Sequence, residues 1–247
     1  MGGVLREQAL PLLAAANNHG DLAVKLSSLK QVKDLILSAE PSSAADLFPY
    51  LLDLQSSPEP LVRKFLLEVL EDIGLNGLKH SSILMSLLFI LLKDHSPLVA
   101  KQAIVTGTNI FCSVLQELSL QFHRHLTVER WLDDLWMWMV KFKGSVHSLL
   151  FEDGPLGLKL LAVKFLEIYI LLFTEDGSDS DKVMAEALGR HRRTFNISWL
   201  VGHHPVLDPA VLSADANRTF NLLMDLLRSA SSVPALLTIS IINRCVF

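Results

Sequence analysis

Residues 57–64 read Ser57-Pro58-Glu59-Pro60-Leu61-Val62-Arg63-Lys64, a turn of Ser, Pro and acidic residues followed by an apolar and basic helix start. The same outline returns at Asp94-His95-Ser96-Pro97-Leu98-Val99-Ala100-Lys101 and at Glu152-Asp153-Gly154-Pro155-Leu156-Gly157-Leu158-Lys159. Proline in the first helical turn loses no needed hydrogen bond, and nearby Ser, Asp or Glu complements the unpaired N–H groups there. Because each copy follows an apolar helical segment, the pattern predicts the end of one helix and the start of the next.

The three copies share a stripe of apolar positions when Val62, Val99 and Leu158 are superposed. The aligned positions that follow are Leu66 with Ala103 and Ala162, and Ile73 with Ile110 and Tyr169. Val99 follows Val62 by 37 residues, close to the period of roughly 40–47 residues found in HEAT and armadillo repeats. Leu158 follows Val99 by 59 residues, and we interpret the extra length, in 119–150, as an enlarged outer helix.

Almost every segment shows the apolar period of a helix, and alternating β-branched runs typical of strands are missing. The predicted helices span 4–17, 21–39, 43–55, 59–74, 77–93, 97–119, 126–150, 156–174, 208–230 and 233–245. The sequence therefore predicts an all-α fold, a HEAT- or armadillo-type helical-repeat solenoid of about five antiparallel helix pairs. We expect 1–247 to form a single domain, with a polar insertion between repeats at about 175–204 and an incomplete last repeat.

Composition argues against several kinds of partner. Lys and Arg total 22 against 26 Asp and Glu, so the net charge of −4 does not favour direct nucleic-acid binding. The apolar segments 83–92 and 156–173 are too short or carry internal charges, so no membrane association is expected. Cys112 and Cys245 lie far apart in helical contexts, which argues against a disulfide framework.

The sequence contains no recognisable motif for phosphate binding, nucleophilic catalysis or metal coordination. We expect no enzyme activity, cofactor, metal site or small-molecule substrate. His203-His204 is expected to serve as surface or capping histidines, with an enzyme site there as the competing hypothesis. The Trp and Met residues of 131–139 are expected in the core, with a ligand groove as the alternative. Arg190-His191-Arg192-Arg193 is either a nuclear-localisation or acidic-partner patch or a solvated loop end.

Partner binding is expected on the inner helices. In a HEAT-type stack the second helix of each pair lines the concave surface, so its polar residues are the default candidates. These candidates are Lys64, Glu68, Lys101 and Lys164. The superposition aligns Lys64 with Lys101 and Glu68 with Lys164, which predicts that they share one helical face. A solvated face without a partner is the alternative.

Three segments in order resemble one known family. Leu29-Lys30-Gln31-Val32-Lys33-Asp34-Leu35-Ile36, then Val62-Arg63-Lys64-Phe65, then Ala162-Val163-Lys164-Phe165-Leu166-Glu167 closely resemble the amino-terminal domain of the symplekin family. His204-Pro205 and the helical segment 217–227 extend the resemblance over nearly the whole chain.

The resemblance implies a nuclear scaffold that joins cleavage and polyadenylation factors in pre-mRNA 3′-end processing. It also implies that the concave face binds a phosphatase of the RNA polymerase II carboxy-terminal domain. By position, the family's phosphatase-contacting lysine is Lys164, whereas its asparagine contact falls on Ala210, a departure that bears on the strength of phosphatase binding. The competing interpretation is a generic HEAT-repeat adaptor in cytoplasmic trafficking or at cell junctions.

Overall fold

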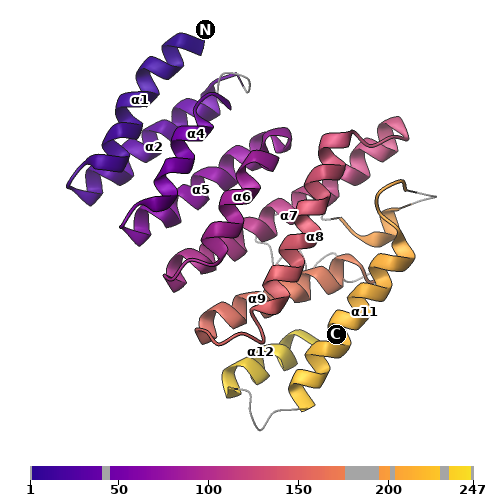
Figure 1. Ribbon diagram of the computed structural model, residues 1–247. Coiled ribbons are helices and arrows are strands. Elements are labelled where there is room, and N and C mark those ends of the chain that lie inside the picture. The colour runs from indigo at the N-terminus through magenta and orange to yellow at the C-terminus, as the bar shows by residue number, and fades with distance from the viewer. Residues whose placement is uncertain (1, 41–44, 176–194, 201–203, 229–233, 246–247) are drawn as a thin grey trace. The chain divides into compact units, whose positions relative to one another are not determined.

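The computed structural model describes residues 2–40, 45–175, 195–200, 204–228 and 234–245 (Figure 1). Within these ranges every regular element is a helix, which confirms the predicted all-α helical-repeat class. The chain divides into two compact units, Met1–Ile110 and Phe111–Phe247, with the division inside one long helix. The expectation that 1–247 folds as one domain stays a prediction.

The first unit is a series of packed helices. Its elements are α1 (Gly2–Asn18), α2 (Leu22–Ser38), α4 (Phe48–Asp53), α5 (Pro60–Asn76), α6 (Ser81–Leu92) and the beginning of α7 (Pro97–His125). α2 packs against both α1 and α5, and α5 packs in turn against α6 (Figure 1). α2 is thus held both by its pair partner α1 and by α5, the inner helix of the next pair.

The second unit is organised around α9 (Leu156–Leu172), which contacts α8 (Arg130–Ser148), α11 (Pro209–Arg228) and α12 (Ala235–Cys245). Its core is rich in aromatic rings. The ring of Phe165 lies 5.4 Å from that of Phe111 and 5.2 Å from that of Phe142, both in edge-to-face geometry. Such pairs add about 0.5–1.5 kcal/mol each to the free energy gained from burial alone.

The apolar stripe predicted from the three repeat copies is confirmed. Val62, Val99 and Leu158 are buried, and so are the residues aligned behind them. Those residues are Leu66, Ala103, Ala162, Ile73, Ile110 and Tyr169. The turns differ from expectation in one respect, because Glu59 precedes α5 without capping it. Its carboxylate instead accepts hydrogen bonds from Lys25 and Ser57.

Two predicted helix boundaries were wrong by more than the two to four residues to which the sequence places a helix end. Residues 43 and 44 of the helix expected at 43–55 lie outside the described part of the chain, and α4 spans only Phe48–Asp53, with Pro49 in its first turn, where proline is favoured. The helix expected at 97–119 continues as α7 to His125, since its last turns are exposed and carry no apolar period to read. Leu126 then adopts a left-handed conformation with φ of 56°, and α8 begins at Arg130, close to the expected start at 126.

The extra length between the second and third repeat copies has two sources. The outer helix α8 has 19 residues against 12 in α6, which agrees with the expected enlarged outer helix. The inner helix α7 has 29 residues against 17 in α5, which the sequence did not indicate. α7 is also long and apolar enough to cross a membrane by length and composition, but 61% of its most apolar window is buried in the protein.

Much of the expected insertion at 175–204, including the basic patch 190–193, lies outside the described residues. The part that is described packs closely. Phe195 is buried against Phe173, with ring centroids 6.0 Å apart. The Asn196 amide donates hydrogen bonds to the carbonyl oxygens of Leu171 and Thr174, at 3.3 and 3.0 Å, and so completes the end of α9.

His204 is buried, and the expectation of a surface position for it was wrong. Its Nδ1 accepts hydrogen bonds from the backbone N–H groups of Val206 and Leu207, at 3.1 and 2.9 Å, so His204 orders the loop before α11 and does not cap a helix. Its Nε2 faces the carbonyl oxygen of Leu118 at 3.4 Å, which fixes the neutral tautomer protonated at Nε2. His203 lies outside the described residues.

Candidate protein-binding surfaces

The polar residues of α5 in the first unit bind one another. Lys64 and Glu68 are half-buried and form an ion pair one helical turn apart. One turn further, Asp72 accepts a hydrogen bond from Lys33 of α2 at 2.9 Å. This hydrogen bond raises the pKa of Lys33, and the charge of Glu68 adds to the effect. Because Lys64 is already paired with Glu68, a partner that binds Lys64 would have to compete with this ion pair.

Lys101 lies in the second turn of α7 and is half-buried. No hydrogen bond or ion pair joins it to Lys64, to Glu68 or to any other residue in the described part of the chain. Three of the predicted site residues thus belong to the first unit, on two helices, and only Lys64 and Glu68 are in direct contact.

Lys164 lies in the middle of α9, the central helix of the second unit. It is half-buried, and Leu160 and Leu161, one turn earlier on the helix, are half-buried as well. Within the described ranges its ammonium group has no carboxylate partner. A partly desolvated cation without a counter-ion favours an acidic group from a binding partner.

Ala210 lies in the first turn of α11 and is exposed. Its N–H group donates a hydrogen bond of 2.9 Å to Oδ1 of Asp208, and the N–H of Val211 donates to the same oxygen at 3.2 Å. Asp208 is therefore the N-cap of α11. The methyl side chain of Ala210 offers a partner no hydrogen bond, unlike the asparagine that the family resemblance implies.

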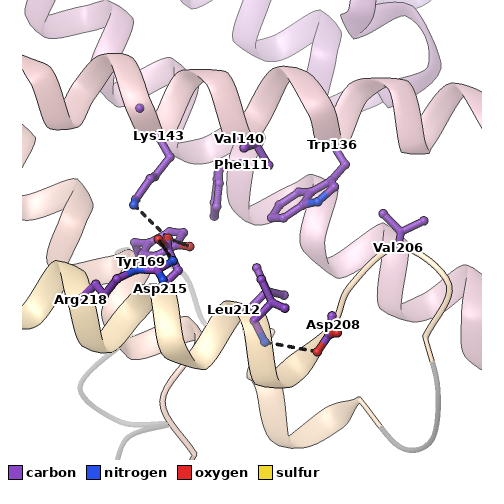
Figure 2. Close-up of a pocket in the computed structure, with 12 residues that line it drawn as sticks. Phe111, Trp136, Val140, Lys143, Tyr169, Val206, Asp208, Leu212, Asp215 and Arg218 are labelled. Atoms are coloured by element: carbon purple, nitrogen blue, oxygen red, sulfur yellow. Dashed lines mark hydrogen bonds and ion pairs between the residues drawn. The ribbon is translucent and has the colours of Figure 1, made fainter.

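A pocket of about 450 Å³ opens between α8 and α11, which we name the α8–α11 pocket (Figure 2). Its walls are mostly apolar, and all of its lining residues belong to the second unit. The lining residues are Phe111, Trp136, Val140, Lys143, Gly144, Tyr169, Val206, Asp208, Val211, Leu212, Asp215 and Arg218. Trp136 and Met139 are buried, as expected for core residues, whereas Met137 is exposed. Trp136 also lines this pocket, and a ligand groove there stays a prediction.

Asp215 of α11 forms the polar end of the pocket. Oδ2 accepts hydrogen bonds from Lys143 at 2.9 Å and from the Tyr169 hydroxyl at 2.6 Å, and Oδ1 accepts one from Arg218 at 3.0 Å. Lys143 also lies over the Tyr169 ring, 4.9 Å from its centroid. Figure 2 shows these side chains converging on Asp215, with Trp136 and Leu212 further along the pocket.

These contacts shift the pKa values of two groups. Burial alone would raise the pKa of Asp215, but the hydrogen bonds from Tyr169, Lys143 and Arg218 outweigh burial and lower it to about 2. Burial and the Asp215 carboxylate raise the pKa of Tyr169 far above its ordinary value. Asp215 is therefore a weak base and Tyr169 a weak acid at neutral pH, so this cluster suits charge pairing and not proton transfer.

The sequence did not indicate the Asp215 cluster. Its members come from α8, α9 and α11, and Lys143 and Asp215 lie 72 positions apart. The one local signal was Gly144, a glycine inside a helical pattern. In the described part of the chain, no three His, Cys, Asp or Glu side chains lie close enough to hold a metal ion.

One comparison with known proteins identifies the family of the chain. A family model described as Symplekin/PTA1 N-terminal matches residues 96–247, which is more than half of the chain. The chain belongs to the symplekin/PTA1 N-terminal family. The predicted symplekin family is thereby confirmed; of the three segments that suggested it, Ala162–Glu167 lies within the matched residues, and the other two lie before them.

The symplekin/PTA1 match begins just before α7 and therefore covers Lys101, Lys164, Ala210 and the α8–α11 pocket. Lys64 and Glu68 lie before the matched residues. Symplekin-family proteins are scaffolds of mRNA 3′-end processing, and membership supports a scaffold role for this chain in that process. The scaffold character of the family also supports a non-enzymatic role.

Proposed function

We propose that this chain is a nuclear, non-catalytic scaffold in pre-mRNA 3′-end cleavage and polyadenylation. In this role it binds other cleavage and polyadenylation factors and a phosphatase of the RNA polymerase II carboxy-terminal domain. Family membership supports the process, and the nuclear location follows from it. The phosphatase contact rests on the surroundings of Lys164.

Lys164 is the observation that carries the phosphatase proposal. It occupies the lysine position of the Ala162–Glu167 segment, is half-buried on α9, and has no counter-ion among the described residues. An acidic group of the phosphatase would complete an ion pair there, with half-buried Leu160 and Leu161 beside it. Lys101 of α7 is a second candidate without an ion pair among the described residues, whereas Lys64 and Glu68 contribute only by exchanging their mutual ion pair for one with the partner.

The test is the affinity of the purified phosphatase for Lys164→Glu, measured by calorimetry. Reversing the charge should weaken binding at least about tenfold, because a partly desolvated ion pair becomes a repulsion. Lys164→Arg should keep most of the affinity. The matched control is Lys141→Glu, which makes the same charge change at an exposed position of α8 in the same unit. Equal affinities for Lys164→Glu and Lys141→Glu would exclude Lys164 from the contact.

A second variant tests the role of Ala210. Ala210→Asn adds an amide at an exposed position whose backbone N–H is already bound to Asp208, so the fold has room for it. If this turn of α11 contacts the phosphatase, the variant should bind several-fold more tightly than the parent chain. Unchanged affinity would confine the contact to α9.

A further inference from the structure

Gly144 is the first sign that the α8–α11 pocket accommodates another molecule. It lies inside α8, where glycine is less stable than alanine because it gives the unfolded chain more freedom. No heavy atom lies within 4 Å of the Cβ that a larger residue would place there, so packing within the chain does not demand a glycine. What the missing side chain does provide is space inside the pocket, since Gly144 lines it.

The charged end of the pocket has spare donors and few spare acceptors. Both oxygens of Asp215 are occupied, by three donors in total. Arg218 is 72% exposed and uses only Nη2 for Asp215, which leaves Nε and Nη1 for another acceptor. Lys143 likewise gives one of its three hydrogens to Asp215. This end of the pocket therefore favours a carboxylate from an incoming molecule.

The rim of the pocket extends the apolar surface beyond the cavity. Val140 on α8 and Val211 on α11 line the pocket and are 46% and 58% exposed. Met137, one turn from Val140 on the same helix, is 54% exposed. A small molecule seated in the cavity would leave these side chains in water, whereas a peptide would cover them with its neighbouring residues.

We propose that the α8–α11 pocket is a docking site for a peptide segment of a protein partner that carries a large apolar or aromatic side chain beside a carboxylate. The apolar side chain enters between Trp136 and Leu212, and the carboxylate pairs with Arg218 and Lys143 (Figure 2). Gly144, next to Lys143 on α8, leaves room at this charged end of the pocket. The site is separate from Lys164, which does not line the pocket. It rests on the geometry of the second unit and not on the phosphatase contact.

The test uses a defined probe, a fluorescein-labelled peptide of sequence Gly-Ser-Glu-Trp-Glu-Glu-Ser-Gly, and measures its anisotropy with the whole chain. Saturable binding with Kd below about 1 mM is expected. A peptide with serine in place of tryptophan, and one with glutamine in place of each glutamate, should each bind at least about tenfold more weakly. Absence of binding by the parent peptide would overturn the proposal.

Gly144→Leu is the decisive variant, because it fills the pocket and also replaces glycine with a better helix former. It should weaken peptide binding at least about tenfold while leaving the melting temperature unchanged or higher. The matched control is Gly154→Leu, at an exposed glycine of the α8–α9 turn where an added Cβ would also meet no atom within 4 Å. Equal affinities for the two variants would overturn the proposal.

Two further measurements identify the occupant. Arg218→Gln should weaken binding of the glutamate peptide about tenfold and leave binding of the glutamine peptide unchanged. N-acetyltryptophan, tested in competition, should bind far more weakly than the peptide, and equal affinity would show a small-molecule site instead. Lys164→Glu should not change peptide binding, so this site and the phosphatase contact fail or succeed independently.

Discussion

The two compact units hold their helices together by different chemistry. In Met1–Ile110, ion pairs join consecutive repeats, and the most buried of them links Arg63 at the start of α5 with Asp94 in the turn before α7, at 2.7 Å. Lys25 of α2 makes the equivalent link to Glu59 at 3.0 Å. In the described part of Phe111–Phe247, aromatic rings and the carboxylate of Asp215 fill the corresponding role.

The repeat alignment shows where the charged links stop. The position of Arg63 is taken by Ala100 in the second copy and by Lys159 in the third. Lys159 donates to the carbonyl oxygen of Leu150 at 3.2 Å, much as Arg63 donates to that of Ser57 at 2.5 Å, but it lacks the link to a following turn in the part of the chain that the structure describes. The repeated sequence pattern therefore predicts where the helices begin, but not which side-chain contacts join one helix to the next.

The largest expected effect on this comparison comes from Arg63→Ala. Arg63 and Asp94 are only 4% and 6% exposed, so removing the guanidinium leaves a buried carboxylate without its cation. We expect the free energy of unfolding to fall by about 3–5 kcal/mol, measured by urea denaturation. Because 1–247 is expected to be one domain, hydrogen exchange should accelerate in both units of the variant together.

The control for Arg63 is Arg228→Ala, since Arg228 pairs with Asp225 on the surface of α11, with exposures of 79% and 70%. That change should stay within about 0.5 kcal/mol. If the two variants lost similar amounts of unfolding free energy, burial would not be the reason why the ion pairs of the first unit stabilise it. Faster exchange in Met1–Ile110 alone would contradict a single cooperative domain.

Asp215→Ala should have the next largest effect, in the second unit. It leaves the buried Tyr169 hydroxyl and the Lys143 ammonium without their acceptor, and we expect a loss of about 2–3 kcal/mol in urea denaturation. Tyr169→Phe removes one donor and should cost about 1 kcal/mol. The pKa of Asp215 lies at about 2, below the ordinary 3.8, so its contribution to stability is present above pH 3.8 and declines as the pH falls from there towards 2. If Asp215→Ala were as stable as the parent chain, the hydrogen bonds of Asp215 would contribute nothing measurable, and aromatic packing would account for the stability of the second unit.

Most of the helix placement could be predicted from the sequence, because the buried stripe of each helix repeats with the helical period. The Asp215 cluster could not, since the fold brings Lys143 and Tyr169 to a helix 72 and 46 positions away. The burial of His204 was missed for a similar reason, because its ring packs against Phe122 of a distant segment, with centroids 4.6 Å apart. Lys164 was predicted from its inner-helix position and from the resemblance, but only the structure shows that it has no counter-ion among the described residues.

His204 gives the second unit a pH dependence of its own. Burial lowers the pKa of His204 below the ordinary 6.5, and the neighbouring charge of His123 acts in the same direction. The unfolded chain therefore binds a proton more readily than the folded one, so stability should fall as the pH drops below 6.5. Unfolding measured at pH 7.5 and at pH 5.5 should show this decline, and His204→Gln should reduce the difference between the two pH values. An identical decline in the variant would assign it to another group.

The smallest expected effect is a gain in stability from Leu126→Gly. Leu126 ends α7 with φ of 56°, a conformation that costs a residue with a side chain about 1–2 kcal/mol, and its side chain is 75% exposed. Part of the gain is offset because glycine makes the unfolded chain more flexible, so we expect a net stabilisation of about 0.5–1 kcal/mol. The shift of the thermal midpoint measures it, and a destabilised variant would mean that the leucine side chain stabilises the α7–α8 turn.

Hydrogen–deuterium exchange of the whole chain, with and without the purified phosphatase of the polymerase carboxy-terminal domain, tests the proposed function most directly. If Lys164 is at the centre of the contact, the phosphatase should slow exchange in peptides that cover α9, Leu156–Leu172. Protection confined to the helices of Met1–Ile110, or none at saturating phosphatase, would contradict it.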